Sequence, residues 1–191
     1  MLKQFVKALD VLEETGSASE VFDYVSRISE QGDREGTFRL LAKYFARRGQ
    51  IEEVLRFAGE IRGDEEATSC LWQVSRELRR KGYDELSREF LDKAYDRANQ
   101  LEGSRWAKAN HFLFISGELH DSGRNDEAIT ALHRALEISP PRRTDRGKFL
   151  AMCSINFAKC NWPKEARTIA ESIKEEPHRE YALREIEKYT S

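Results

Sequence analysis

Two groups of basic residues, one of them beside a tryptophan, carry the clearest chemistry in this sequence. Their members are Arg39, Lys43 and Arg47, and Trp72, Arg76 and Arg79. Arg39 and Lys43 are four residues apart, as are Trp72 and Arg76, so each pair would share one face of a helix. Because arginine binds carboxylates through two parallel hydrogen bonds, these residues favour the recognition of acidic groups.

Catalytic and metal-binding patterns are missing from the sequence. It has no His-Glu-x-x-His, no glycine-rich phosphate loop, no Gly-x-Ser-x-Gly and no zinc-ligand spacing. His120 follows Glu118 closely, but residues two apart on a helix point to different faces. We therefore expect no enzyme activity, no cofactor and no metal site.

The elements that position the basic residues are predicted by an internal repeat. A turn residue followed five positions later by a small or apolar residue recurs five times: Gly16/Val21, Gly49/Val54, Gly82/Ser87, Gly123/Ala128 and Asn161/Ala166. The turns are 33, 33, 41 and 38 residues apart. Self-similarity at this period is typical of stacked helical hairpins, and such stacks mostly present binding surfaces.

Apolar stripes flank each turn at helical spacing. The stripe before the turn comprises Phe5, Ala8, Leu12; Phe38, Leu41, Phe45; Leu71, Val74, Leu78; Phe112, Ile115, Leu119; and Leu150, Cys153, Phe157. The stripe after it comprises Val21, Val25, Ile28; Val54, Ala58, Ile61; Ser87, Leu91, Ala94; Ala128, Leu132, Ala135; and Ala166, Ala170, Ile173. A small residue stands seven before the turn in four units, at Ala42, Ser75, Ser116 and Ser154, where two helix backbones would approach closely.

The segment 123–140, Gly-Arg-Asn-Asp-Glu-Ala-Ile-Thr-Ala-Leu-His-Arg-Ala-Leu-Glu-Ile-Ser-Pro, resembles the second half of a tetratricopeptide repeat. Phe112 and the pair Ile115 and Ser116 fit the same pattern, and the other four units resemble it more weakly. The resemblance implies an all-α fold, a right-handed superhelical solenoid of about five helix-turn-helix repeats plus a C-terminal capping helix. The two long units exceed the family's 34-residue repeat by roughly seven residues, which two extra helical turns can absorb.

The repeat predicts one domain over residues 1–191, a length that suffices for a continuous core. In the capping helix, Glu187 takes the place of the small residue, so no second helix is expected to pack there. The predicted repeats are 1–33, 34–66, 67–103, 104–142 and 143–178, and the capping helix is 179–189.

The family resemblance implies that the first helices line a concave groove. Positions ten, six, three and two before each turn would face it, and a period of 33 residues would place Lys43 beside Arg76. The predicted groove residues are Arg39, Lys43, Arg47, Trp72, Arg76, Arg79, Leu113 and His120, and Arg80 stands at the position two before its turn. Some tetratricopeptide domains hold a C-terminal carboxylate with lysine and asparagine residues, but these positions contain no asparagine.

The leading hypothesis is a non-enzymatic interaction module, or scaffold, whose groove binds an acidic protein or peptide segment, such as one ending in a free carboxylate. The competing interpretation is that the cations are solvated surface charges, neutralised across the turns by Glu52, Glu53, Asp84 and Glu85. Trp72 favours the groove, because a tryptophan left exposed usually has a partner. The alternative is that Trp72 is partly buried between repeats. Both interpretations are left open at this point.

Two further functions are alternatives. Helical repeats of about 35 residues also bind RNA, but the pI of 6.2 and the confinement of the cations to two units argue against nucleic acid. An apolar end of the repeat array could instead make the protein a self-associating regulatory subunit, a homodimer through its terminal repeats. A secretion-chaperone role is a variant of peptide binding that the residues do not distinguish.

The composition and the cysteine content indicate the cellular compartment of the protein. No stretch approaches the 18 apolar residues of a membrane span, and charges interrupt the first ten residues, unlike a signal peptide. The cysteines, Cys70, Cys153 and Cys160, are odd in number and form no Cys-x-x-Cys pair. We expect a cytoplasmic protein with reduced thiols that does not contact membranes. We also expect Trp106, Phe112, Phe114 and Phe149 to pack in the core or between repeats, and residues 140–143 to form a loop.

Overall fold

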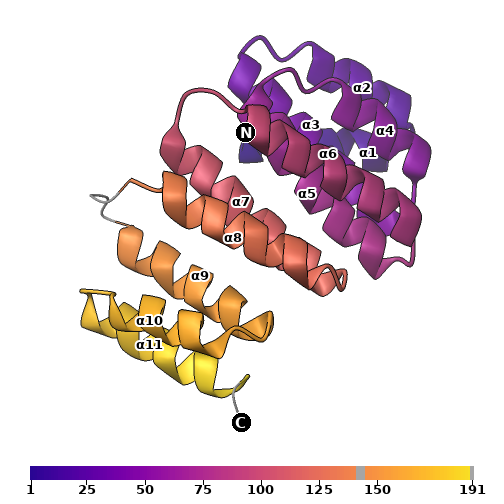
Figure 1. Cartoon of the computed structure of the whole chain (residues 1–191). Coiled ribbons are helices and arrows are strands. Elements are labelled where there is room, and N and C mark those ends of the chain that lie inside the picture. Colours follow the sequence, from indigo (N-terminus) through magenta and orange to yellow (C-terminus); the bar gives the residue numbers. More distant parts are fainter. Residues whose placement is uncertain (141–144, 190–191) are drawn as a thin grey trace. The chain divides into compact units, whose positions relative to one another are not determined.

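The computed structural model describes residues 1–140 and 145–189, which form eleven α-helices and no β-strand (Figure 1). The all-α prediction is confirmed. No helix in these two ranges is long and apolar enough to cross a lipid bilayer. The helices are α1 (Leu2–Thr15), α2 (Ala18–Ser26), α3 (Gln31–Arg48), α4 (Ile51–Gly59), α5 (Asp64–Arg80), α6 (Asp84–Gln100), α7 (Arg105–Asp121), α8 (Asn125–Ile138), α9 (Arg146–Lys159), α10 (Pro163–Glu171) and α11 (Glu176–Glu187).

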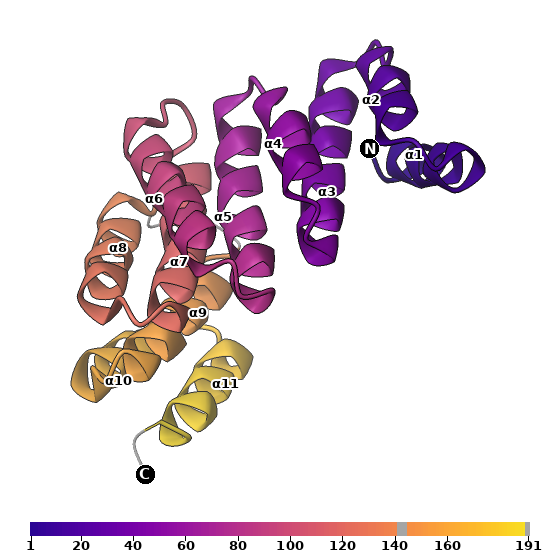
Figure 2. The same ribbon diagram turned by 90° about the vertical axis from the view of Figure 1, so that its right-hand side faces the viewer.

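The chain divides into two compact units, Met1–Arg97 and Ala98–Ser191, and each is considered by itself. In the first unit α3 packs against α1, α2, α4 and α5, and α3 and α5 lie side by side (Figure 2). In the second unit α7 packs against α8, and α9 packs against α10 and α11 (Figure 1). The single domain, the number of repeats and the handedness of a solenoid stay predictions.

The five predicted turn residues all adopt the left-handed conformation that ends a helix. Their φ angles lie between +64° at Asn161 and +81° at Gly82. Asparagine is the non-glycine residue that tolerates this region best, and Asn161 is the only non-glycine residue with positive φ in the part of the chain that the structure describes. In each hairpin the second helix begins two residues after the turn.

The extra length of the two long repeats is found in their second helices, whereas the spacing predicts lengthened helices without specifying which ones. Helices α2, α4 and α10 each have 9 residues, whereas α6 has 17 and α8 has 14. The additional residues of α6 amount to about two helical turns, so its apolar face keeps its direction.

The predicted stripes form the hydrophobic core. None of their residues is exposed, and most are fully buried. The half-buried members are Phe5, Leu12, Ile28, Ala58, Leu71 and Leu150. The small residues seven before the turn are buried as well, and Ser75 and Ser87 exchange hydrogen bonds of 2.8 Å between hydroxyl and backbone carbonyl, which joins α5 to α6 at close range.

A basic residue near the start of several first helices caps the preceding helix. The Nη1 atoms of Arg34 and Arg179 donate to carbonyls six residues earlier, at distances of 2.7 and 3.1 Å. Arg146 donates to Pro140 at 2.9 Å, and Lys108 donates to Leu101 at 3.1 Å. These cations satisfy carbonyls that lack partners at a helix C-terminus. Arg34, Lys108 and Arg146 each stand fifteen residues before a turn, a regularity that the sequence analysis missed.

Several finer predictions are wrong. The repeat boundaries after residues 33 and 66 fall inside α3 and α5, and the capping helix α11 begins at Glu176 instead of 179, because proline at its start initiates the helix earlier. Phe114 is 38% exposed, although it was expected to pack in the core or between repeats.

Glu187, at the place where other repeats have a small buried residue, is exposed, as expected. The boundary at 142 and most of the loop at 140–143 lie outside the described residues.

Candidate functional site

The basic residues of the first unit meet acidic residues at the contact between α3 and α5. On α3, Arg39, Lys43 and Arg47 follow one another every fourth residue and form one row. On α5 the facing polar residues are Glu66, Gln73, Glu77 and Arg80. The apolar stripes hold the two helices together, so the polar rows meet at the edge of the packed core.

Arg39 is engaged within the protein. Its Nε donates to Glu66 Oε1 at 2.6 Å, and its Nη1 donates to Gln73 Oε1 at 3.0 Å. Its Nη2 lies 3.8 Å from the sulfur of Met1, and only 15% of the side chain is exposed. All three nitrogens of the guanidinium group therefore have partners inside the first unit, and Arg39 connects α3 to α5.

Glu77 is a buried carboxylate surrounded by three cations. Its Oε1 accepts from Arg47 Nη2 at 3.1 Å and lies 4.0 Å from Lys43 Nζ, and its Oε2 lies 3.5 Å from Arg80 Nη1. Burial raises the pKa of Glu77, but the hydrogen bond from Arg47 and the charges of Arg47, Arg80 and Lys43 outweigh it and lower the pKa below its usual value. Glu77 is therefore ionised at neutral pH. We name Lys43, Arg47, Glu77 and Arg80 the Glu77 cluster.

Lys43 lies in a crowd of positive charge. Its pKa is lowered by burial and by the charges of Arg47, Arg76 and Arg39, while Glu77 raises it only in part. The predicted neighbourhood of Lys43 and Arg76 stays a prediction. A further negative charge at this place would relieve the repulsion among the cations.

Arg47 and Arg80 form the accessible part of the cluster. Their side chains are 58% and 59% exposed, and each uses one terminal nitrogen in its contact with Glu77. A guanidinium group has five N–H donors. Each arginine thus retains donors that face solvent, on either side of a carboxylate that fixes its position.

Trp72 corrects one expectation. Its side chain is buried, with 8% exposed, and the guanidinium carbon of Arg76 lies 5.0 Å from the centre of its ring. Of the two interpretations of this residue, exposure in the groove and burial, the structure supports burial, so Trp72 no longer favours the groove. Arg76 and Arg79 are half-buried.

The two groove residues predicted in the second unit have different surroundings. Leu113 is 1% exposed and belongs to the core, so it cannot form an accessible apolar wall. His120 is half-buried, and its Nδ1 lies 2.8 Å from Asn125 Oδ1, which joins the end of α7 to the start of α8. The six predicted groove residues of the first unit lie on α3 and α5.

The acids that neutralise the cations differ from those expected. The prediction named Glu52, Glu53, Asp84 and Glu85 across the turns, whereas the ion pairs of Arg39, Lys43, Arg47 and Arg80 are made with Glu66 and Glu77. Glu66 and Glu77 could have been considered as partners, because they lie on the same predicted helix as the second basic group. The pairing with Arg39, Lys43 and Arg47 was not predicted, because these residues are about 30 positions away in the sequence.

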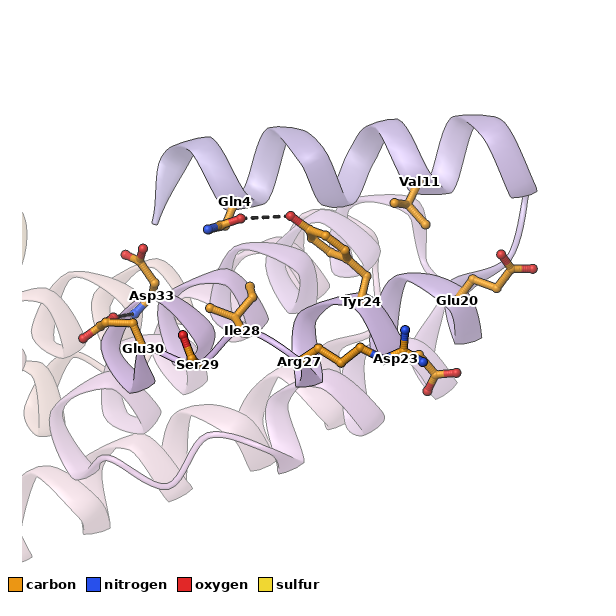
Figure 3. A pocket seen from close by; sticks show the side chains of 10 residues that line it. All are labelled: Gln4, Val11, Glu20, Asp23, Tyr24, Arg27, Ile28, Ser29, Glu30 and Asp33. Carbon is orange, nitrogen blue, oxygen red and sulfur yellow. Dashed lines mark hydrogen bonds between the residues drawn. The ribbon is translucent and has the colours of Figure 1, made fainter.

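A pocket of about 620 Å³ lies between α1 and the α2–α3 connection, away from the Glu77 cluster (Figure 3). Its acidic lining residues are Glu20, Asp23, Glu30 and Asp33. Tyr24 donates a 2.9 Å hydrogen bond to Gln4, which links α2 to α1 within the pocket (Figure 3). Glu30 accepts from the backbone of Asp33, which is in turn paired with the N-terminal amine, so these acids take part in local structure.

The three cysteines are free thiols in buried positions. Burial raises the pKa of Cys70 to about 12 and also raises the pKa of Cys153 and Cys160. Because the thiolate is the reactive form, these thiols are poor nucleophiles.

Comparisons with known proteins inform the fold alone. No protein-family model and no curated protein sequence matches this chain. A solved structure that is similar is the crystal structure of Ton1535 from Thermococcus onnurineus NA1, with 16% identity and a TM-score of 0.63. The similarity covers 96% of this chain and 57% of Ton1535, so the chain spans little more than half the length of that protein.

Proposed function

We propose that this protein is a non-enzymatic interaction module of the tetratricopeptide-like class, and that the Glu77 cluster binds an acidic peptide segment. The observation that carries the proposal is the pair of exposed arginines, Arg47 and Arg80, held on either side of the buried Glu77 carboxylate.

The arrangement fixes the arginines before a ligand arrives. A flexible surface arginine loses side-chain freedom when it binds a carboxylate, and that loss weakens binding. Glu77 already restrains Arg47 and Arg80 through one nitrogen each, so part of this loss occurs on folding. The remaining donors can accept a carboxylate from solvent in the two-point geometry that arginine favours.

The charge of the cluster also favours an anionic ligand. Three cations surround one carboxylate, so the cluster has an excess of positive charge. A peptide with two neighbouring acidic side chains could place one against each arginine. A neutral or basic peptide would leave the repulsion unrelieved.

The proposal is tested with two fluorescent peptides of equal length, one with alternating glutamates and one with glutamine at the same positions. We expect binding of the acidic peptide alone, and an affinity that falls as salt is raised from about 50 to 500 mM, since exposed charges are screened over about 10 Å or less. Arg47→Glu with Arg80→Glu should abolish binding.

The matched control is Arg134→Glu with Arg167→Glu. These arginines are also exposed, lie on helices and form one ion pair each, so the change in net charge is the same. Equal loss of binding in both double variants would show a non-specific charge effect and exclude the site. Retention on an RNA column at physiological salt, with no acidic-peptide binding, would favour the RNA alternative.

A further inference from the structure

The outer face of α1 carries an apolar stripe and a charged stripe side by side. Leu2 and Val6, four residues apart, form the apolar stripe, and Lys3, Lys7, Asp10 and Glu14 form the charged stripe. The charged residues have the spacing of four, three and four that keeps side chains on one face of a helix. The opposite face of α1, with Phe5, Ala8, Leu9 and Leu12, packs against the core.

This outer face is open to solvent. Leu2 is 68% exposed and Val6 is 51% exposed, which are large values for apolar side chains on neighbouring helical turns. All four residues of the charged stripe are exposed, and none of them forms an ion pair within the part of the chain that the structure describes.

The order of charges on α1 opposes its helix dipole. The helix has no acidic residue in its first turn and no basic residue in its last turn; instead Lys3 lies in the first turn and Glu14 in the last. Cations at the N-terminus and anions at the C-terminus are unfavourable for an isolated helix. Helices α3, α4, α5 and α6 of the same unit have acidic first turns and basic last turns.

An antiparallel copy of the same helix would compensate this unfavourable order of charges. The midpoint of Lys3 and Glu14 is the same as that of Lys7 and Asp10, between residues 8 and 9. If two antiparallel helices cross at this point, Lys3 of one lies opposite Glu14 of the other, and Lys7 lies opposite Asp10. Two-fold symmetry repeats each pair, and the two helix dipoles oppose one another. The adjacent apolar stripe would be covered in the same contact.

We infer that the outer face of α1 is a docking surface for a second copy of this chain, which pairs with it antiparallel. The contact of one 14-residue helix with its twin is smaller than a standard interface of about 1,600 Å². The dimer is therefore a weak one that dissociates on dilution.

Two charge variants test the inference. Lys3→Glu with Lys7→Glu makes the stripe wholly acidic, and Asp10→Lys with Glu14→Lys makes it wholly basic. Each change also improves the match with the helix dipole, so both variants should fold, which far-UV circular dichroism and thermal unfolding can verify. Sedimentation velocity then measures mass across a dilution series up to about 1 mM.

We expect the wild type to approach twice its 22.2 kDa mass at the highest concentrations. Each variant alone should stay monomeric, and an equimolar mixture of the two should restore association, as should the quadruple variant. A monomeric wild type would overturn the inference. So would dimers of either single-sign variant, which would indicate another interface, or a mixture that fails to associate.

Discussion

Arg39 of α3 and Glu66 of α5 form a 2.6 Å salt bridge that connects two helices distant in sequence. Eight residues further along α3, the row of cations ends in a residue that is accessible to solvent, Arg47. Arg39 has partners at all its nitrogens, whereas Arg47 is more than half exposed. Residues of the same charge on one helix face therefore have different roles, and substitution separates them.

Arg39→Ala should destabilise the first unit by about 1–3 kcal/mol, because it leaves two α5 acceptors without their donor in a mostly buried position. The affinity of the folded protein for an acidic peptide should not change. Arg47→Ala, the matched substitution, should have the opposite profile, with little loss of stability and at least several-fold weaker binding. Urea unfolding and fluorescence anisotropy measure the two effects, and identical profiles for the two variants would refute the division of roles.

Glu77→Gln should reduce stability by about 1 kcal/mol at neutral pH, since hydrogen bonds to half-exposed arginines are partly screened. The pKa of Glu77 in the folded protein is below its unfolded value of about 4.3. Its contribution to stability is therefore complete above about pH 5 and is lost as pH falls through the folded pKa.

Urea unfolding of both proteins at several pH values checks this prediction for Glu77. The difference in unfolding free energy between wild type and variant should be constant above pH 5 and should narrow below about pH 4.3. A difference that widens in acid would contradict the lowered pKa.

Asn161→Gly should leave stability unchanged or raise it by several tenths of a kcal/mol, because glycine adopts the positive φ of 64° without strain. Asn161→Ala should lower stability by about 1 kcal/mol, since alanine lacks the local polar contacts that help asparagine there. Differential scanning calorimetry measures both. Gly123→Ala, at the equivalent turn of the preceding hairpin, serves as a control and should also be destabilising, because the Cβ of alanine is strained at the positive φ of 78°. Unchanged stability in both alanine variants would contradict the need for a left-handed residue at these turns.

Arg34→Ala should destabilise the first unit by about 1 kcal/mol through loss of the 2.7 Å hydrogen bond to the carbonyl of Ile28. Arg62→Ala is the control, because Arg62 is exposed and lies in the connection between α4 and α5. Hydrogen exchange should show faster opening at the end of α2 only in the Arg34 variant. Equal exchange in both variants would exclude a capping role.

Much of the fold follows from local features of the sequence. A left-handed turn needs glycine or asparagine whatever surrounds it, so Gly16, Gly49, Gly82, Gly123 and Asn161 could be identified directly. The apolar stripes follow from helical periodicity, and the spacing of the turns predicts that two repeats have longer helices. These predictions succeed because each depends on residues near one another in the chain.

The candidate site was predicted less well, because its properties depend on neighbours distant in sequence. The row Arg39, Lys43 and Arg47 is visible in the sequence, but the partners Glu66 and Glu77 are decided by how α3 packs against α5. The burial of Trp72 is likewise decided by tertiary packing and cannot be read from its place in the helix. Sequence by itself determined where the helices turn and which face is apolar; only the tertiary structure decided which charges are paired inside the protein and which are left at its surface, since ion pairing and burial act over distances that the order of residues does not specify.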